Sequence, residues 1–312
     1  MSYQDLIQRP IVLSPDLVTI ASGNTAVSDT TRLQSKVHAG VLIHRINFLI
    51  RAPSLTSVAT VLDFAPQIGV KLMVGPHPLM SEFVPVWNLC ETMQWTHFFC
   101  GRSGSEVASQ AYWYSRYTWK LPKPMYVPAS MPVTATWSRM ADSAFAFGGS
   151  AGVQLALVGH TMKQGSRLGE SDIPFASRYI SPSATDGTTV NARSNENDLR
   201  NTLDKDLHVQ RLVGRVRIAS TSAPTQNEDA EIVRSVTNAR IYDWRGYNLT
   251  GGLNSDLIRW ADTFSPDRRS WNASFDLPPT KSVFVEVNNL TSASGNSRTA
   301  MVGIVGWRKE KL

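Results

Sequence analysis

The 312-residue chain carries one series of sequence features twice, in the same order. Each half has an apolar run with an internal arginine, then a segment with helical spacing, then an aromatic-x-Leu-Pro motif, then two closing apolar runs. Self-similarity of this kind is the sequence signature of a duplicated structural unit. The pattern therefore predicts two similar units of about 150 residues, a usual domain size.

The first shared feature is a run of residues with strand character. It covers Leu42–Ile50 in the first half and Arg211–Ala219 in the second. Apolar side chains alternate with other residues from Ile46 onward, and again from Arg215 onward. A period of two with branched residues predicts strands that bury one face.

The second shared feature is a short amphipathic segment. Ser105 and Ser255 are each suited to cap a helix with apolar residues on one side. The second helix must end near Ser265 because Pro266 follows. We therefore predict helices over residues 105–112 and 255–264.

The remaining shared features close each half. The motif reads Trp119-Lys120-Leu121-Pro122 in the first half and Phe275-Asp276-Leu277-Pro278 in the second. Each proline should lie at a strand start, an edge or a bulge, because proline has no N–H to donate to a sheet. The closing runs are Val133–Trp137 and Val153–Gly159 in the first half, and Val283–Val287 and Ala300–Gly306 in the second.

The offset between matching residues falls along the chain. It is 170 from Arg45 to Arg215, 156 from Leu121 to Leu277, and 147 from Gly159 to Gly306. Duplicated units with loops of different length would give this drift.

These landmarks predict four regions. Residues 1–35 have no counterpart in the other half and are expected to form an N-terminal arm. Residues 36–162 form the first unit and residues 207–312 the second. The polar stretch 163–206, with Pro182 and Asp186-Gly187, is expected to be a linker and lead-in.

The predicted fold class is all-β. Many short strands separated by turn signals are typical of a sandwich, and the unit size matches an eight-stranded jelly roll. A parallel sheet is disfavoured because strands and helices do not alternate along the chain. We predict two tandem eight-stranded jelly rolls, each with a short helix before its last strands.

This arrangement resembles the double jelly-roll major capsid proteins of tectiviruses, corticoviruses, adenoviruses and finnlakeviruses. The resemblance implies a structural virion protein, not an enzyme, whose pseudo-hexagonal homotrimers tile an icosahedral capsid. The partners it implies are other copies of the chain and minor capsid and vertex proteins. It also implies location in the virion after synthesis in the host cytoplasm. The size resembles that of the small members found in bacteriophages with an internal membrane.

The charge balance is mildly basic. Lysine and arginine number 31 against 25 acidic residues, which gives a net charge of +6. The basic residues are dispersed, so we predict no sequence-specific nucleic-acid binding. Arg9, Arg308, Lys309 and Lys311 are expected to attract anionic lipid headgroups of an internal membrane.

The sequence predicts no catalytic, cofactor-binding or metal-binding residues. Cys90, His97 and Cys100 are the single set suited to a soft metal, and we interpret them as part of an aromatic core. The glycine-rich stretch 148–152 lacks the phosphate-loop pattern and is interpreted as a turn. The acidic residues interpreted as solvated loops are Asp204, Asp206, Glu228, Asp229 and Glu231.

Aromatic residues leave other functions open. Trp119 and Trp137 are predicted to lie in the core, whereas Tyr114 and Tyr117 fit either a core or a subunit contact. One alternative is a hydrolase on tandem jelly rolls, similar to bacterial peptide N-glycosidases. Another is a spike module that binds a carbohydrate or a receptor. The start of the chain lacks a secretory signal pattern and only two cysteines occur, which counts against the hydrolase.

Overall fold

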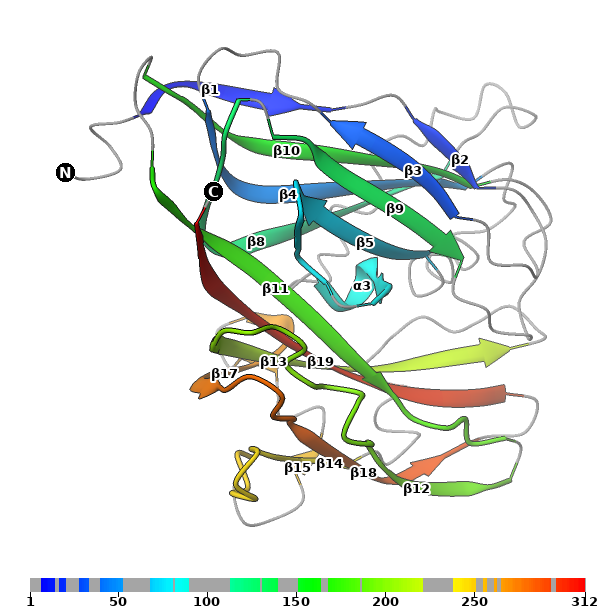
Figure 1. Ribbon diagram of the computed structural model, residues 1–312. Helices are drawn as coiled ribbons and strands as arrows, with labels where there is room; N and C mark the ends of the chain where they lie inside the picture. The colour runs from blue at the N-terminus through cyan, green and yellow to red at the C-terminus, as the bar shows by residue number, and fades with distance from the viewer. Residues whose placement is uncertain are drawn as a thin grey trace, which may run out of the picture.

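The chain was analysed as a computed structural model. The described residues are 7–14, 17–20, 28–33, 40–52, 68–80, 82–89, 113–129, 131–139, 151–163, 168–185, 187–220, 238–250, 255–256, 261–262, 265–292 and 296–311. Nearly all of them lie in strands or in the turns between strands (Figure 1).

The first unit consists of two antiparallel sheets. One, the β4 sheet, has the strand order β1-β10-β4-β8, with β2 also paired to β10. The other, the β5 sheet, has the order β3-β9-β5-β6, with β7 also paired to β5. The strands of the β4 sheet are β1 (Ile7–Leu13), β2 (Val18–Ile20), β4 (Val41–Ala52), β8 (Trp113–Val127) and β10 (Ala151–Met162). Those of the β5 sheet are β3 (Ser28–Leu33), β5 (Ile68–Val74), β6 (His77–Pro78), β7 (Val84–Pro85) and β9 (Val133–Arg139).

The second unit repeats this plan. The β13 sheet has the order β11-β19-β13-β17-β16, and the β14 sheet has the order β12-β18-β14-β15. The strands of the β13 sheet are β11 (Glu170–Ile180), β13 (Leu207–Ser220), β16 (Ala261–Asp262), β17 (Ser265–Leu277) and β19 (Asn296–Lys311). Those of the β14 sheet are β12 (Thr189–Arg193), β14 (Asn238–Tyr242), β15 (Ser255–Asp256) and β18 (Phe284–Thr291).

The order of strands is the same in both units. Counting β1 with β2 as one strand, and leaving out the short β6 and β16, each unit has eight strands. In each unit the first, eighth, third and sixth strands form one sheet, and the second, seventh, fourth and fifth form the other. This eight-stranded, two-sheet arrangement is a jelly roll. The predicted fold of two tandem jelly rolls is therefore confirmed.

Each unit buries its own apolar core between its two sheets. Trp119 and Trp137 are fully buried in the first unit, and the ring of Trp137 meets that of Phe48 edge-on, with centroids 6.1 Å apart. Edge-on contacts suit the charge distribution of aromatic rings. The core predicted for the two tryptophans is confirmed, while the side chains of Tyr114 and Tyr117 lie outside the described residues.

The predicted boundaries differ from the structure. Within the predicted arm, β1 and β2 pair with β10, and β3 pairs with β9. Within the predicted linker, β11 pairs with β19 and β12 pairs with β18. These segments are thus the first two strands of each jelly roll. Sequence reasoning missed them because strands such as Ser28–Leu33 are polar and lack an apolar alternation.

The structure does not contain the predicted helix of the second unit, and it does not describe the predicted helix of the first. The prediction for residues 255–264 is wrong, because β15 and β16 occupy parts of that segment. The prediction for residues 105–112 lies outside the described part of the chain. The helix that the described residues do contain is the single turn α3 (Val86–Leu89). No helix of the described residues is long and apolar enough to span a membrane.

Candidate functional site at the junction of the two units

The two jelly rolls meet at a shared apolar junction. The segment from β6 to α3 belongs to the first unit and lies against the β13 sheet of the second; Figure 1 shows α3 between β5 and β11. Four buried residues of the second unit, namely Ile173, Ala176, Val213 and Val305, belong to the same apolar cluster as the core of the first. The units are therefore joined by buried contacts as well as by the chain.

Backbone hydrogen bonding extends across the junction. The N–H of Ala176 on β11 donates to the carbonyl of Leu79, with an N···O distance of 2.9 Å. Met80 forms a parallel bridge with Ala176. A backbone bond between two elements fixes their register more tightly than side-chain packing alone.

Ser171 joins the edges of the β4 and β13 sheets. Its Oγ accepts a hydrogen bond from the Tyr126 N–H at 2.8 Å and donates one to the Tyr126 carbonyl at 3.1 Å. Both residues are buried. One hydroxyl thus bonds two buried backbone groups of β8.

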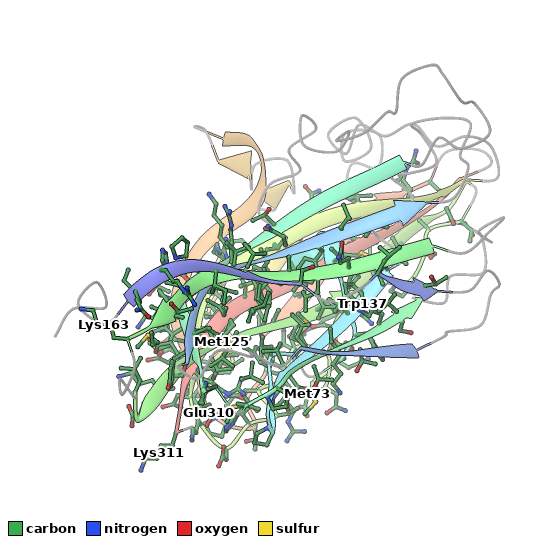
Figure 2. All side chains as sticks on the ribbon, turned by 90° about the horizontal axis from the view of Figure 1, so that it is seen from above. Met73, Met125, Trp137, Lys163, Glu310 and Lys311 are labelled. Atoms are coloured by element: carbon green, nitrogen blue, oxygen red, sulfur yellow. The ribbon has the colours of Figure 1, made fainter. Side chains whose placement is uncertain are left out.

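A buried charge group sits where β19 ends. The Arg308 side chain is fully buried; its Nε donates to Glu310 at 2.7 Å and its Nη2 donates to the Pro78 carbonyl at 2.8 Å. Lys205 Nζ donates to the other Glu310 oxygen at 2.5 Å, and His77 Nδ1 lies 3.8 Å from that oxygen. Figure 2 shows Glu310 next to Lys311 at this end of the strand.

The pKa of Glu310 reflects these contacts. Burial alone would raise it, but hydrogen bonds and charges from Lys205 and Arg308 outweigh burial and lower the pKa below its ordinary value. Burial lowers the pKa of Arg308, and Glu310 opposes that effect. Each charge in the group is therefore held in place by its opposite partner.

A second charged contact crosses the junction further along β11. Arg178 Nε donates to the Phe83 carbonyl at 2.6 Å, and its Nη2 lies 3.8 Å from a Glu82 carboxylate oxygen. Burial raises the pKa of Glu82, although the Arg178 charge opposes the rise. Burial likewise lowers the pKa of Arg178.

A third contact involves Lys123 of β8. Its Nζ lies 3.4 Å from the centroid of the Trp307 ring and 4.0 Å from an Asp172 oxygen. A cation over the face of tryptophan is an attractive arrangement. The junction is thus held by apolar packing, by hydrogen bonds and by pairs of opposite charge.

The basic residues predicted to face lipid differ in how exposed they are. Arg308 is buried in the junction, so its predicted role at a lipid surface is wrong. Lys309 and Lys311 are exposed, but across the β11–β19 ladder they stand opposite Asp172 and Glu170. Cross-strand pairs of opposite charge reduce the positive potential of this end of the strand.

The other candidate residues are only partly covered by the structure. Among the described residues no group of three or more His, Cys, Asp or Glu side chains could hold a metal ion. Asp204 and Asp206 are exposed, in agreement with their interpretation as solvated. Arg9 is also exposed, on β1. The residues that lie outside the described part are Cys90, His97, Cys100, Glu228, Asp229, Glu231 and the stretch 148–150.

Sequence reasoning missed the residues that build the junction. Ser171, Arg178 and Glu310 each have a partner that lies 45 or more positions away along the chain. A lone serine, arginine or glutamate carries no local pattern that marks such a role. The apolar run of residues 173–176 in β11 was a sequence signal for this strand, and it lay inside the stretch interpreted as a linker.

The strand order and the junction together define the class: a double jelly-roll protein. The sequence matches no protein-family model, and no curated protein matches it significantly. Among solved structures, the MCP of STIV, the Sulfolobus Turreted Icosahedral Virus, is similar to this chain. The similarity covers 95% of this chain and 96% of the STIV chain, with 11% sequence identity and a TM-score of 0.46. The Faustovirus major capsid protein is similar over 98% and 92%, with 9% identity and a TM-score of 0.41.

A third similar structure is that of PNGF-II. The similarity covers 96% of this chain and 66% of the PNGF-II chain, with 10% sequence identity and a TM-score of 0.38. A major capsid protein is thus among the structures to which this chain is similar. Similarity at these levels concerns the fold, and the assignment of the fold rests on the strand order described above.

Proposed function

We propose that this chain is the major capsid protein of an icosahedral virus and that it assembles as a pseudo-hexagonal homotrimer. The observation that carries the proposal is the duplicated jelly roll held at a fixed junction. Three copies of a two-barrel chain present six similar barrels around one axis. Six similar barrels give an outline that can tile a flat facet of a shell.

The fixed junction supports this role. A facet needs building blocks of constant shape, so the two barrels of each chain must keep one relative orientation. The buried contacts of Arg308 and Ser171 serve that purpose, because breaking either one removes a buried hydrogen bond between the two units. An enzyme would require reactive side chains that converge on a substrate. The polar side chains of the junction instead bond to one another and to the backbone.

The finer parts of the proposal follow the family resemblance. The virion would be that of a bacteriophage with an internal membrane, and minor capsid and vertex proteins would bind the trimers. Exposed Lys309, Lys311 and Arg9 remain available to anionic headgroups, although Asp172 and Glu170 offset the first two. An attraction of this kind would weaken with added salt.

Size-exclusion chromatography with light scattering tests the proposal. The purified chain should form a stable species of about three times 34.4 kDa, and negative-stain electron microscopy should show hexagonal outlines. A monomer at all concentrations would contradict it. A monomer that releases glycans from a glycopeptide, or that binds an immobilised glycan, would favour the hydrolase or the spike module respectively.

A further inference from the structure

The β4 sheet has an unusual charge composition. Its five strands contain six lysine and arginine residues and no aspartate or glutamate. One face of this sheet packs on the core through residues such as Ile46 and Trp119. The opposite, outer face must therefore meet solvent or a partner with a set of cations that no carboxylate on the same strands can balance.

A row of exposed and half-buried side chains crosses the outer face. The ladders place Val12 of β1 opposite Val158 of β10, Val158 opposite Arg45 of β4, and Arg45 opposite Lys120 of β8. Val12 is 62% exposed, and both Arg45 and Lys120 are exposed. We call this row the basic face. It combines a pair of valines with a pair of cations on neighbouring strands.

The two cations of the basic face are unfavourably placed in the isolated chain. Like charges directly opposite each other on neighbouring strands destabilise a sheet. Neither Arg45 nor Lys120 forms an ion pair with any residue in the described part of the chain. An external anionic surface would remove the repulsion, and the exposed valine would gain by burial.

The same chain carries an exposed group of acidic residues. The segment of residues 196–206, which we call the acidic segment, connects β12 to β13 and exposes Glu196, Asp204 and Asp206. Of its two cations, Lys205 is already bonded to Glu310 of the junction. The exposed charge of this segment is therefore predominantly negative.

The basic face and the acidic segment belong to different units of the chain. Lys205 is bonded to Glu310, and Glu310 also lies beside His77 of β6, a strand of the β5 sheet. The β5 sheet is the layer opposite the β4 sheet, whose strands lie above Glu310 in the view of Figure 2. Among the described residues no ion pair joins the two surfaces. Two different patches of opposite charge are what a head-to-tail contact around a ring requires.

We propose that the basic face of one chain binds the acidic segment of a second copy, so that the first unit of each chain contacts the second unit of its neighbour. This inference rests on the proposed function and deepens it by assigning the surfaces through which the trimer closes. The contact joins Arg45 and Lys120 to Asp204 and Asp206, with Val12 buried at its apolar end. Complementary charges of this kind fix register and exclude wrong partners.

Charge reversal tests the pairing in the full-length chain. The variant Arg45→Glu/Lys120→Glu and the variant Asp204→Lys/Asp206→Lys should each raise the dissociation constant of the trimer by about tenfold or more. Combining all four substitutions in one chain should restore trimers, because both sides of the contact are then reversed. The matched control Arg193→Glu/Lys281→Glu reverses two exposed cations of the second unit and should leave the trimer intact. Circular dichroism would verify that every variant is folded.

The possible outcomes separate this inference from the proposed function. A wild-type trimer that neither reversal weakens would overturn the pairing and leave the capsid role standing. Weakening by each reversal without rescue by the combination would also overturn it, because the surfaces would then meet different partners. Normal trimers that lose binding to phosphatidylserine vesicles after Arg45→Glu/Lys120→Glu would assign the basic face to a membrane. A wild-type monomer would refute both proposals.

Discussion

Gly159 of β10 and Gly306 of β19 occupy the same position in the two jelly rolls. A Cβ atom on Gly159 would overlap the carbonyl oxygen of Leu42, and one on Gly306 would overlap the carbonyl oxygen of His208. In both units the overlapped residue belongs to the neighbouring third strand, β4 or β13. The final strand of each unit therefore approaches the third strand too closely for any side chain.

The close approach coincides with a β-bulge that is also duplicated. The β4–β10 ladder skips His44 between Ile43 and Arg45, and the β13–β19 ladder skips one residue at the matching place, before Arg211. A bulge bends its strand and increases the local twist. The shared bulge, with the close approach at the matching glycine, is structural support for the duplication.

The first prediction concerns these glycines. Gly159→Ala and Gly306→Ala should each lower the free energy of unfolding by at least about 3 kcal/mol, since a backbone carbonyl cannot move aside as a side chain can. Gly169→Ala is the control, because nothing lies within 4 Å of its Cβ position; its effect should stay within about 0.5 kcal/mol. Urea unfolding monitored by tryptophan fluorescence measures both. Equal effects at Gly159 and Gly169 would contradict the close approach.

The second prediction concerns the hydroxyl that joins the sheet edges. Ser171→Ala should cost about 1–3 kcal/mol, because it leaves the N–H and carbonyl of Tyr126 without that buried partner. Ser183→Ala removes a hydroxyl bonded to Thr299 on an exposed residue and should cost less. Thermal unfolding compares the two variants. A larger loss at Ser183 would argue against Ser171 as a link between the units.

The third prediction concerns the buried ion pair of the junction. Arg308→Met should cost about 3 kcal/mol because Glu310 would lose one of its two cationic partners. Arg308→Met combined with Glu310→Leu should recover part of that loss, since no carboxylate then remains buried. The control Arg193→Met removes a side chain that is 60% exposed and should change little. Chemical unfolding of the three variants provides the comparison, and an absence of any recovery would count against the pairing.

The contribution of Glu310 to the free energy of unfolding depends on pH in a definite direction. Because the folded-state pKa of Glu310 is lowered, its contribution to stability is present above the unfolded pKa, which is near 4.5. That contribution is lost as the pH falls through the folded pKa. The stability difference between wild type and Glu310→Gln should therefore shrink below about pH 4.5. A difference that grew on acidification would show that the sign is wrong.

The fourth prediction concerns the histidine pair at the bulge. His44 Nε2 and His160 Nδ1 are 2.8 Å apart, and burial, followed by the His160 charge, lowers the pKa of His44. The unfolded chain then binds a proton at a higher pH than the folded chain does. The free energy of unfolding should therefore fall as the pH drops from about 6.5, and it should fall less in His44→Gln. Identical pH profiles for the two proteins would exclude a contribution from His44.

The repeated landmarks allowed much of the fold to be predicted. The two aromatic-x-Leu-Pro motifs fall in β8 and at the end of β17, which are the sixth strands of their units. The expected match of Gly159 with Gly306 is confirmed by their shared geometry. The expected match of Arg45 with Arg215 is wrong, because the bulges align Arg45 with Arg211. Strands tolerate such a shift in sequence comparison because alternating apolar residues look alike at every second position.

Local sequence thus determined the properties that depend on side-chain period and backbone chemistry: the β class, the tandem duplication and the buried tryptophans. Tertiary structure alone decided which polar segments complete the sheets, since strands such as β3 and β12 are held by backbone hydrogen bonds to remote partners. It also decided which charges are buried and which are exposed. Arg308 and Lys309 are neighbours in sequence, yet the alternation of the final strand puts one in the junction and the other in solvent.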